Sequence, residues 1–64
     1  MKQYRYVLIT RPEDEIAMVK AVQEMRIDGI MWPNSVAPQF NLLLTEEELF
    51  VLKLKVPVVK CDRA

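Results

Sequence analysis

KQYRYVLIT, residues 2–10, is the stretch of sequence that decides the fold. Side chains alternate in direction along a strand, so this stretch would present two sets, Tyr4, Tyr6 and Leu8 on one side and Arg5, Val7 and Ile9 on the other. Both sets are largely apolar, whereas a strand with one wet face alternates apolar and polar residues. The stretch therefore predicts a central strand that is contacted on both faces.

The next segment predicts an amphipathic helix over residues 12–28. Thr10 and Glu13 have the spacing of a capping box, and apolar residues then recur every three or four positions. Gly29 follows as the expected left-handed residue that ends this helix.

The second half of the chain predicts four further segments and a loop: an extended run at 30–32, a loop at 34–38, a strand at 39–44, a helix at 46–54 and a strand at 58–62. Thr45 and Glu48 repeat the capping-box spacing in front of the second helix. Apolar and lysine residues alternate from 51 to 56, so a strand there stays open as an alternative.

The resulting order, β-α-β-β-α-β, predicts a single α+β domain over residues 1–64 with the ferredoxin-like plan. In that plan a four-stranded antiparallel sheet carries two helices on one face, with the first and third strands central. Pro33 and Pro57 fall in or beside the two presumed edge strands, where proline is tolerated.

The amino-acid composition limits the classes of function that this protein could have. The 64 residues include nine basic and nine acidic side chains, so the net charge is zero and a nucleic-acid partner is disfavoured. No apolar run suits a membrane helix and no signal-peptide layout is present, so we expect a soluble, cytoplasmic protein. The 52% hydrophobic content is high for so short a chain and favours oligomerisation.

No residue pattern indicates catalysis. Cys61 is the only cysteine and the chain has no histidine, so a thiol nucleophile would lack its usual base and zinc its usual ligands. The acidic clusters at 13–15 and 46–48 are explained by helix capping, and one glycine cannot build a phosphate loop. We therefore expect no enzyme activity, no metal and no cofactor, and a structural role for Cys61.

Two helices can cover only one face of the expected sheet. With Val7, Ile9, Phe40, Leu42 and Leu44 facing the helices, the other face would carry the predicted partner interface, Tyr4, Tyr6, Leu8, Trp32 and Leu43. This predicts a non-catalytic interaction module that forms a homodimer, or that binds and regulates or inhibits another protein. Such a module would suit an accessory inhibitor or adaptor, including one of phage type.

Two alternatives remain open. Tyr4 and Tyr6 on a central strand are similar to the base-stacking aromatics of small RNA-binding sheets. In addition, Leu44-Thr45-Glu46 opening a helix, then Pro57-Val58-Val59 and Asp62, resemble the propeptides of subtilisin-like proteases and their stand-alone inhibitor relatives. That resemblance implies the same fold, a sheet face docked on the protease, and residues 61–64 inserted in its active site.

Overall fold

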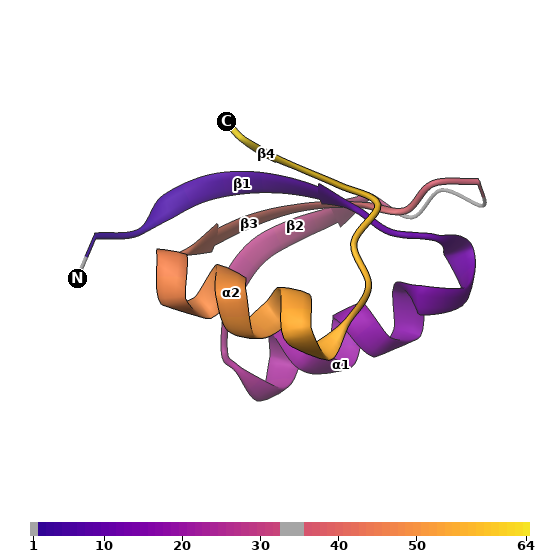
Figure 1. Ribbon diagram of the computed structural model, residues 1–64, viewed down its shortest axis with the longest axis horizontal. Helices are drawn as coiled ribbons and strands as arrows, with labels where there is room; N and C mark the ends of the chain where they lie inside the picture. Colours follow the sequence, from indigo (N-terminus) through magenta and orange to yellow (C-terminus); the bar gives the residue numbers. More distant parts are fainter. Residues whose placement is uncertain (1, 33–35) are drawn as a thin grey trace.

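The chain folds into a four-stranded antiparallel sheet with two helices on one of its faces (Figure 1). The computed structural model describes residues 2–32 and 36–64. The elements are β1 (Tyr4–Ile9), the 3-10 turn η1 (Pro12–Asp14), α1 (Glu15–Glu24), β2 (Asp28–Trp32), β3 (Gln39–Leu44), α2 (Glu46–Lys55) and β4 (Lys60–Arg63). The strand order β2-β3-β1-β4 confirms the predicted α+β architecture, with the first and third strands central.

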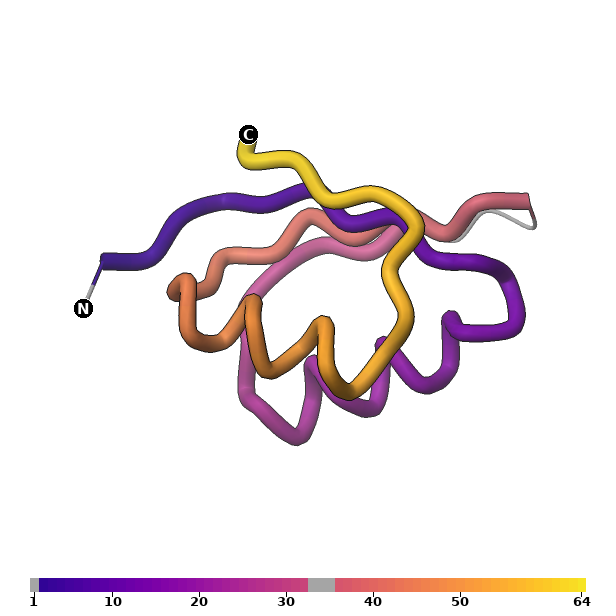
Figure 2. The backbone as a smooth tube through the Cα atoms, viewed as in Figure 1, coloured from indigo at the N-terminus to yellow at the C-terminus, as the bar shows by residue number. Residues whose placement is uncertain are grey.

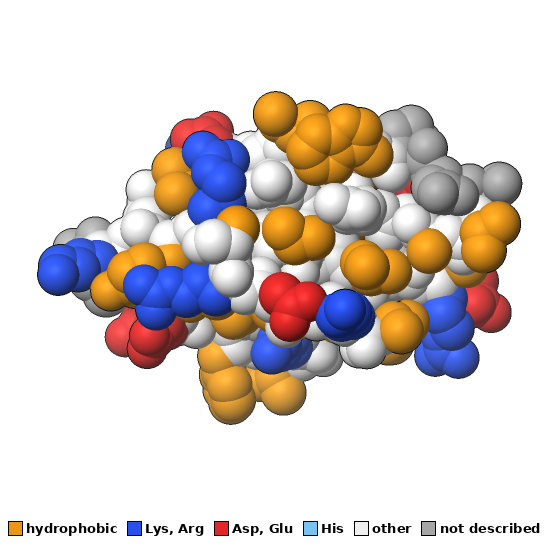
Figure 3. Space-filling view, turned by 90° about the horizontal axis from the view of Figure 1, so that it is seen from above, with side chains coloured by type: hydrophobic (Ala, Val, Ile, Leu, Met, Phe, Trp, Pro, Cys, Tyr) orange, Lys and Arg blue, Asp and Glu red, His pale blue; other side chains and the backbone are white. Residues whose placement is uncertain are grey.

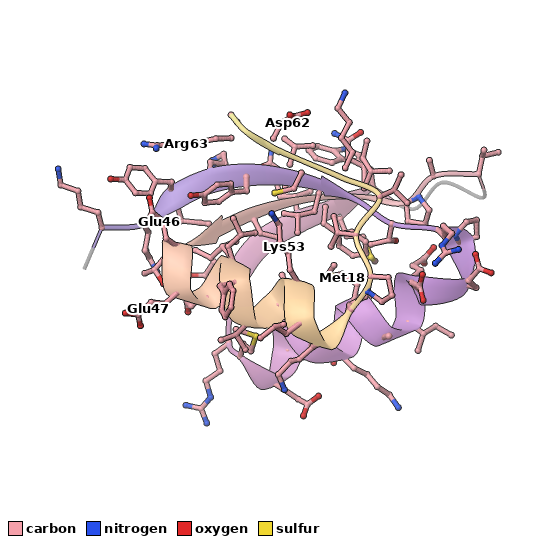
Figure 4. The ribbon with its side chains drawn as sticks, in the orientation of Figure 1. Met18, Glu46, Glu47, Lys53, Asp62 and Arg63 are labelled. Carbon is pink, nitrogen blue, oxygen red and sulfur yellow. The ribbon has the colours of Figure 1, made fainter. Side chains whose placement is uncertain are left out.

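The pairing of β1 with β3 decides which side chains form the core. Tyr6 lies opposite Leu42 and Leu8 opposite Phe40, and directly opposed residues point to the same face of a sheet. All four are buried, Leu8 completely. They pack with Met18, which lies between α1 and the sheet (Figure 4), and with the other core residues Ala21, Ile27, Leu44, Leu52 and Val56.

The predicted orientation of β1 is therefore wrong, because Tyr6 and Leu8, not Val7 and Ile9, face the helices. Arg5 explains the difference. It shares a face with Val7 and Ile9, and on the helix side its charge would have to be buried without compensation. The predicted orientation of β3 is confirmed, since Phe40, Leu42 and Leu44 are buried.

The first helix is shorter than predicted and begins and ends differently. Thr10 does not cap it, because this residue is buried at the end of β1, where its N–H donates to the Pro38 carbonyl at 3.1 Å. At the other end, the N–H of Ile27 donates to the Val22 carbonyl at 3.0 Å and that of Arg26 to the Gln23 carbonyl at 3.2 Å. These two bonds form a Schellman motif.

The left-handed residue of this motif is Arg26, with φ 55°, and not Gly29 as predicted. The motif buries Ile27 beside Val22, which is partly buried against the core. Gly29 instead lies within β2, directly opposite Leu42 of β3. A Cβ at position 29 would lie 2.5 Å from the Asn41 backbone oxygen and 2.9 Å from the Leu42 Cα. The glycine is needed because the two strands approach closely there.

The second helix begins as predicted. The N–H of Glu48 donates to the Thr45 hydroxyl oxygen at 3.1 Å, and the N–H of Thr45 donates to the Glu48 carboxylate at 2.8 Å. This confirms the capping box and excludes a strand at 51–56.

The last strand begins two residues later than predicted and ends at Arg63. It runs alongside β1 (Figure 2). Backbone hydrogen bonds extend the pairing at both ends, from the Val59 N–H to the Ile9 carbonyl at 2.8 Å and from the Ala64 N–H to the Arg5 carbonyl at 2.9 Å. Pro57 lies between α2 and this edge strand. Pro33 and part of the predicted loop at 34–38 lie outside the described residues.

Replacing Arg26 with glycine should stabilise the domain by about 0.5–1 kcal/mol, because glycine adopts a left-handed conformation without steric cost. Thermal and urea unfolding would measure the gain. Arg26→Ala is the matched control: it removes the same side chain but keeps the Cβ, so it should give no gain. Equal effects of the two variants would contradict strain at this position.

Gly29→Ala should destabilise the domain by about 1–3 kcal/mol. Alanine alone would favour a strand by about 0.5–1 kcal/mol over glycine, but the backbone of β3 blocks the added Cβ. The free energy of unfolding in urea would measure the sum of the two effects. A variant as stable as the parent would show that β2 can move away from β3 at no cost.

Candidate functional site

The face of the sheet opposite the helices is not covered by another element of the described structure (Figure 1). We call it the open face. The register of the strands places these residues on it: Arg5, Val7, Ile9, Asp28, Ile30, Trp32, Gln39, Asn41, Leu43, Lys60 and Asp62. Figure 3 looks onto this face and shows hydrophobic side chains spread across it between charged ones.

The apolar part of the open face lies in two strips with amides between them. On β2, Ile30 and Trp32 are 55% and 48% exposed. On β1, Val7 and Ile9 are half-buried. The strand between them, β3, contributes two amides and Leu43, and the Asn41 Oδ1 accepts a 3.5 Å hydrogen bond from the Arg5 guanidinium.

The β4 border of the open face is charged. The Lys60 Nζ and an Asp62 carboxylate oxygen are 3.6 Å apart, and both side chains are about two-thirds exposed. Asp62 points away from the helices (Figure 4). An ion pair so exposed to water contributes little to stability. The Lys60–Asp62 pair therefore makes this border polar without stabilising the fold to a large extent.

The structure divides the five predicted interface residues between the two faces. Trp32 and Leu43 lie on the open face. Tyr4, Tyr6 and Leu8 lie on the helix side, so their prediction as part of an uncovered surface is wrong. Tyr6 and Leu8 are buried there, and the Tyr4 ring is covered by the Arg63 guanidinium, 3.6 Å from the ring centroid.

Sequence reasoning missed Val7, Ile9 and Ile30 as parts of the open face. Arg5 was the available signal, because residues two apart on a strand share a face and a charged residue marks the side next to water. Tyr4 and Tyr6, on which the RNA-binding alternative was based, lie on the helix side of the sheet and are therefore not on the open face. Among the described residues, Trp32 is the one aromatic side chain on this face, and it lies on an edge strand.

A second exposed apolar surface lies on the outer side of α2. Phe50, Val51 and Leu54 are 65%, 38% and 72% exposed, whereas Leu52 on the inner side is fully buried. Residues 50 and 54 are one turn apart and therefore adjacent on the helix surface. This helix thus presents apolar side chains both to the core and to solvent.

Cys61 lies beside a surface hollow of about 320 Å³ that is also lined by Lys53, Val58, Val59 and Lys60. Burial raises the pKa of the Cys61 thiol; nearby Lys53 acts in the opposite direction, and Asp62 raises it further. The thiol is therefore protonated at neutral pH, unlike an activated nucleophile. The side chain packs partly buried against the core.

The acidic clusters lie where the helices begin. Glu46 and Glu47 are in the first turn of α2 (Figure 4). In the other cluster, an Asp14 carboxylate oxygen lies 3.6 Å from the Arg11 Nε and a Glu13 oxygen lies 3.9 Å from it. Within residues 2–32 and 36–64, no three histidine, cysteine or acidic side chains come together as a metal site would require.

Comparisons with protein families, curated proteins and solved structures give no match for this chain. Neither helix in the described part of the chain has the length and apolarity needed to cross a membrane.

The two faces of β1 can be separated by a pair of lysine variants. Tyr6→Lys should unfold the domain or cost about 3 kcal/mol or more, because Tyr6 is 6% exposed and a charge there is buried without a partner. Val7→Lys, one residue along on the open face, should cost no more than about 1 kcal/mol. Circular dichroism and urea unfolding of both proteins would measure this. The reverse ranking would contradict the described orientation of β1.

Proposed function

We propose that this chain is a non-catalytic protein-interaction module that binds and regulates another protein through the open face of its sheet. The observation that supports the proposal is the exposure of Ile30 and Trp32 on the same uncovered face that carries Val7 and Ile9. Exposed apolar surface of this kind usually marks an interface.

The chemistry of the open face suits a protein partner. Tryptophan is enriched among the residues that contribute most to protein–protein binding, and Trp32 already presents about half of its surface to solvent. Gln39 and Asn41 lie between the apolar strips, where their amides can donate and accept hydrogen bonds with a partner backbone. The charges of β4 and Arg5 lie at the border, as in the polar rim of an interface.

The element order and strand order support our proposal that the domain has the ferredoxin-like plan. We also propose a cytoplasmic location, because the chain has a single cysteine and that thiol is unpaired. An inhibitor or adaptor role for the module is in keeping with its small size.

The subtilisin-propeptide resemblance stays a separate proposal, and it requires a change in the structure of the C-terminal residues. Residues 60–63 form β4, and the Ala64 N–H also bonds to β1. A tail inserted into a protease would first have to leave this pairing. The open face makes no such demand, and we therefore favour it as the binding surface.

The proposal can be tested by site-specific photo-crosslinking in a lysate of the organism that encodes the chain. A photoreactive residue in place of Asn41, at the centre of the open face, should give one discrete crosslinked protein. The same residue in place of Lys20, exposed on α1, serves as the control and should not. Mass spectrometry of the product would identify the partner.

Affinity measurements with the purified partner would then complete the test. Val7→Lys should weaken binding by about 100-fold, a value typical of a central contact. Phe50→Lys, on the outer side of α2, should leave the affinity unchanged. Equal crosslinking from positions 20 and 41, or an unchanged affinity of Val7→Lys, would overturn the proposal.

A further inference from the structure

The two edge strands of the sheet differ in the polarity of their exposed side chains. On β4, Lys60, Asp62 and Arg63 put charges along the edge, which is how proteins commonly prevent an edge strand from pairing with another chain. On β2, the edge carries Ile30, Met31 and Trp32, each at least 39% exposed. Asp28 is the one charged residue of that strand.

The helix layer does not close over this apolar edge. No residue of β2 is buried, whereas residues alternate between half-buried and buried along the neighbouring β3. A groove of about 140 Å³ lies between α1 and the edge. Residues of α1, β2 and β3 line it: Val19, Val22, Gln23, Gly29, Ile30, Met31, Phe40 and Leu42.

The sequence of β2 is complementary to itself when two copies run antiparallel. Centred on Ile30, the register places Ile30 opposite Ile30, Gly29 opposite Met31 and Asp28 opposite Trp32. In this register, the numbers of two opposed residues differ by zero, two or four. Every second residue of a strand directs its N–H and C=O groups to the same side, so the free backbone groups of the two copies lie opposite each other. Matched side chains also point to the same face.

This register brings a side chain to the groove. Gly29 and Met31 lie on the helix side of β2, because they are opposite the buried Leu42 and Phe40. The Met31 of a second copy, opposite Gly29, would enter the groove over the position that has no side chain. Methionine is flexible and fits irregular apolar spaces.

We propose that β2 is a self-association edge: two copies of this chain pair antiparallel through β2 about a two-fold axis at Ile30, and Met31 of each fills the groove beside Gly29 of the other. A second copy pairs with the free backbone N–H and C=O groups of β2 and fills both grooves at once. An unrelated strand would need a side chain of its own that fits the groove. The zero net charge of the chain adds no overall repulsion between the copies. The inference does not depend on the partner of the open face.

Light scattering and sedimentation over a concentration series test the proposal. The parent should dimerise reversibly, with a Kd on the order of 1–100 µM because a single strand pair is a small interface. Met31→Lys should weaken dimerisation at least about 10-fold, since it places a charge in the groove. Val7→Lys, on the open face and away from β2, should dimerise like the parent.

Crosslinking gives a second measurement that does not require Met31→Lys to fold. In a Cys61→Ala background, Ile30→Cys should react with a short bis-maleimide to give covalent dimer at least about 10-fold faster than Ile16→Cys. Ile16 is a suitable control because it is more exposed, at 72%, and lies on α1. A monomeric parent at millimolar concentration, or equal crosslinking of the two variants, would overturn the proposal. Loss of the dimer in Val7→Lys alone would also overturn it, and would place self-association on the open face.

Discussion

The pairing of β1 with β3 is the constraint on which the rest of this structure depends. Its register puts Tyr6 and Leu8 beside Leu42 and Phe40, and these side chains form the layer on which both helices pack. A chain of this length buries only about 60% of its unfolded surface, so it cannot form a second apolar layer on the opposite face. The apolar residues of that face therefore stay uncovered within one copy of the chain.

Local chemistry made most of the architecture predictable. The β-α-β-β-α-β element order predicted which strands would be central, in agreement with the prolines beside the presumed edge strands. The Thr45–Glu48 pair predicted the start of α2 because two complementary hydrogen bonds require that spacing. The faces of β1 were harder, since both sets of side chains are largely apolar. What decided them was Arg5, whose charge is costly to bury, together with the long-range pairing to β3, which no local pattern contains.

The end of the first helix shows a different kind of limit. Glycine is the usual left-handed residue at a helix end, yet here the only glycine of the chain is needed in β2, where a Cβ would meet the backbone of β3. The left-handed position therefore falls to Arg26, three residues earlier. Burial of Ile27 within the Schellman motif fixes that position. The sequence alone does not show whether the single glycine ends the helix or allows β2 to approach β3 closely. The second role depends on Asn41, which lies 12 residues away in the chain.

Pairing through β2 would also determine how the open faces are presented. An antiparallel strand pair within one continuous sheet is related by a two-fold axis normal to that sheet, so both helix layers lie on one side and both open faces on the other. Ile30 and Trp32 would then stand at the centre of a joint surface, and Val7 and Ile9 farther out on each copy. Such a surface can engage two copies of a partner, or a symmetric one, and the second contact forms at a high effective concentration. Weak self-association would in this way strengthen binding without adding any contact within each face.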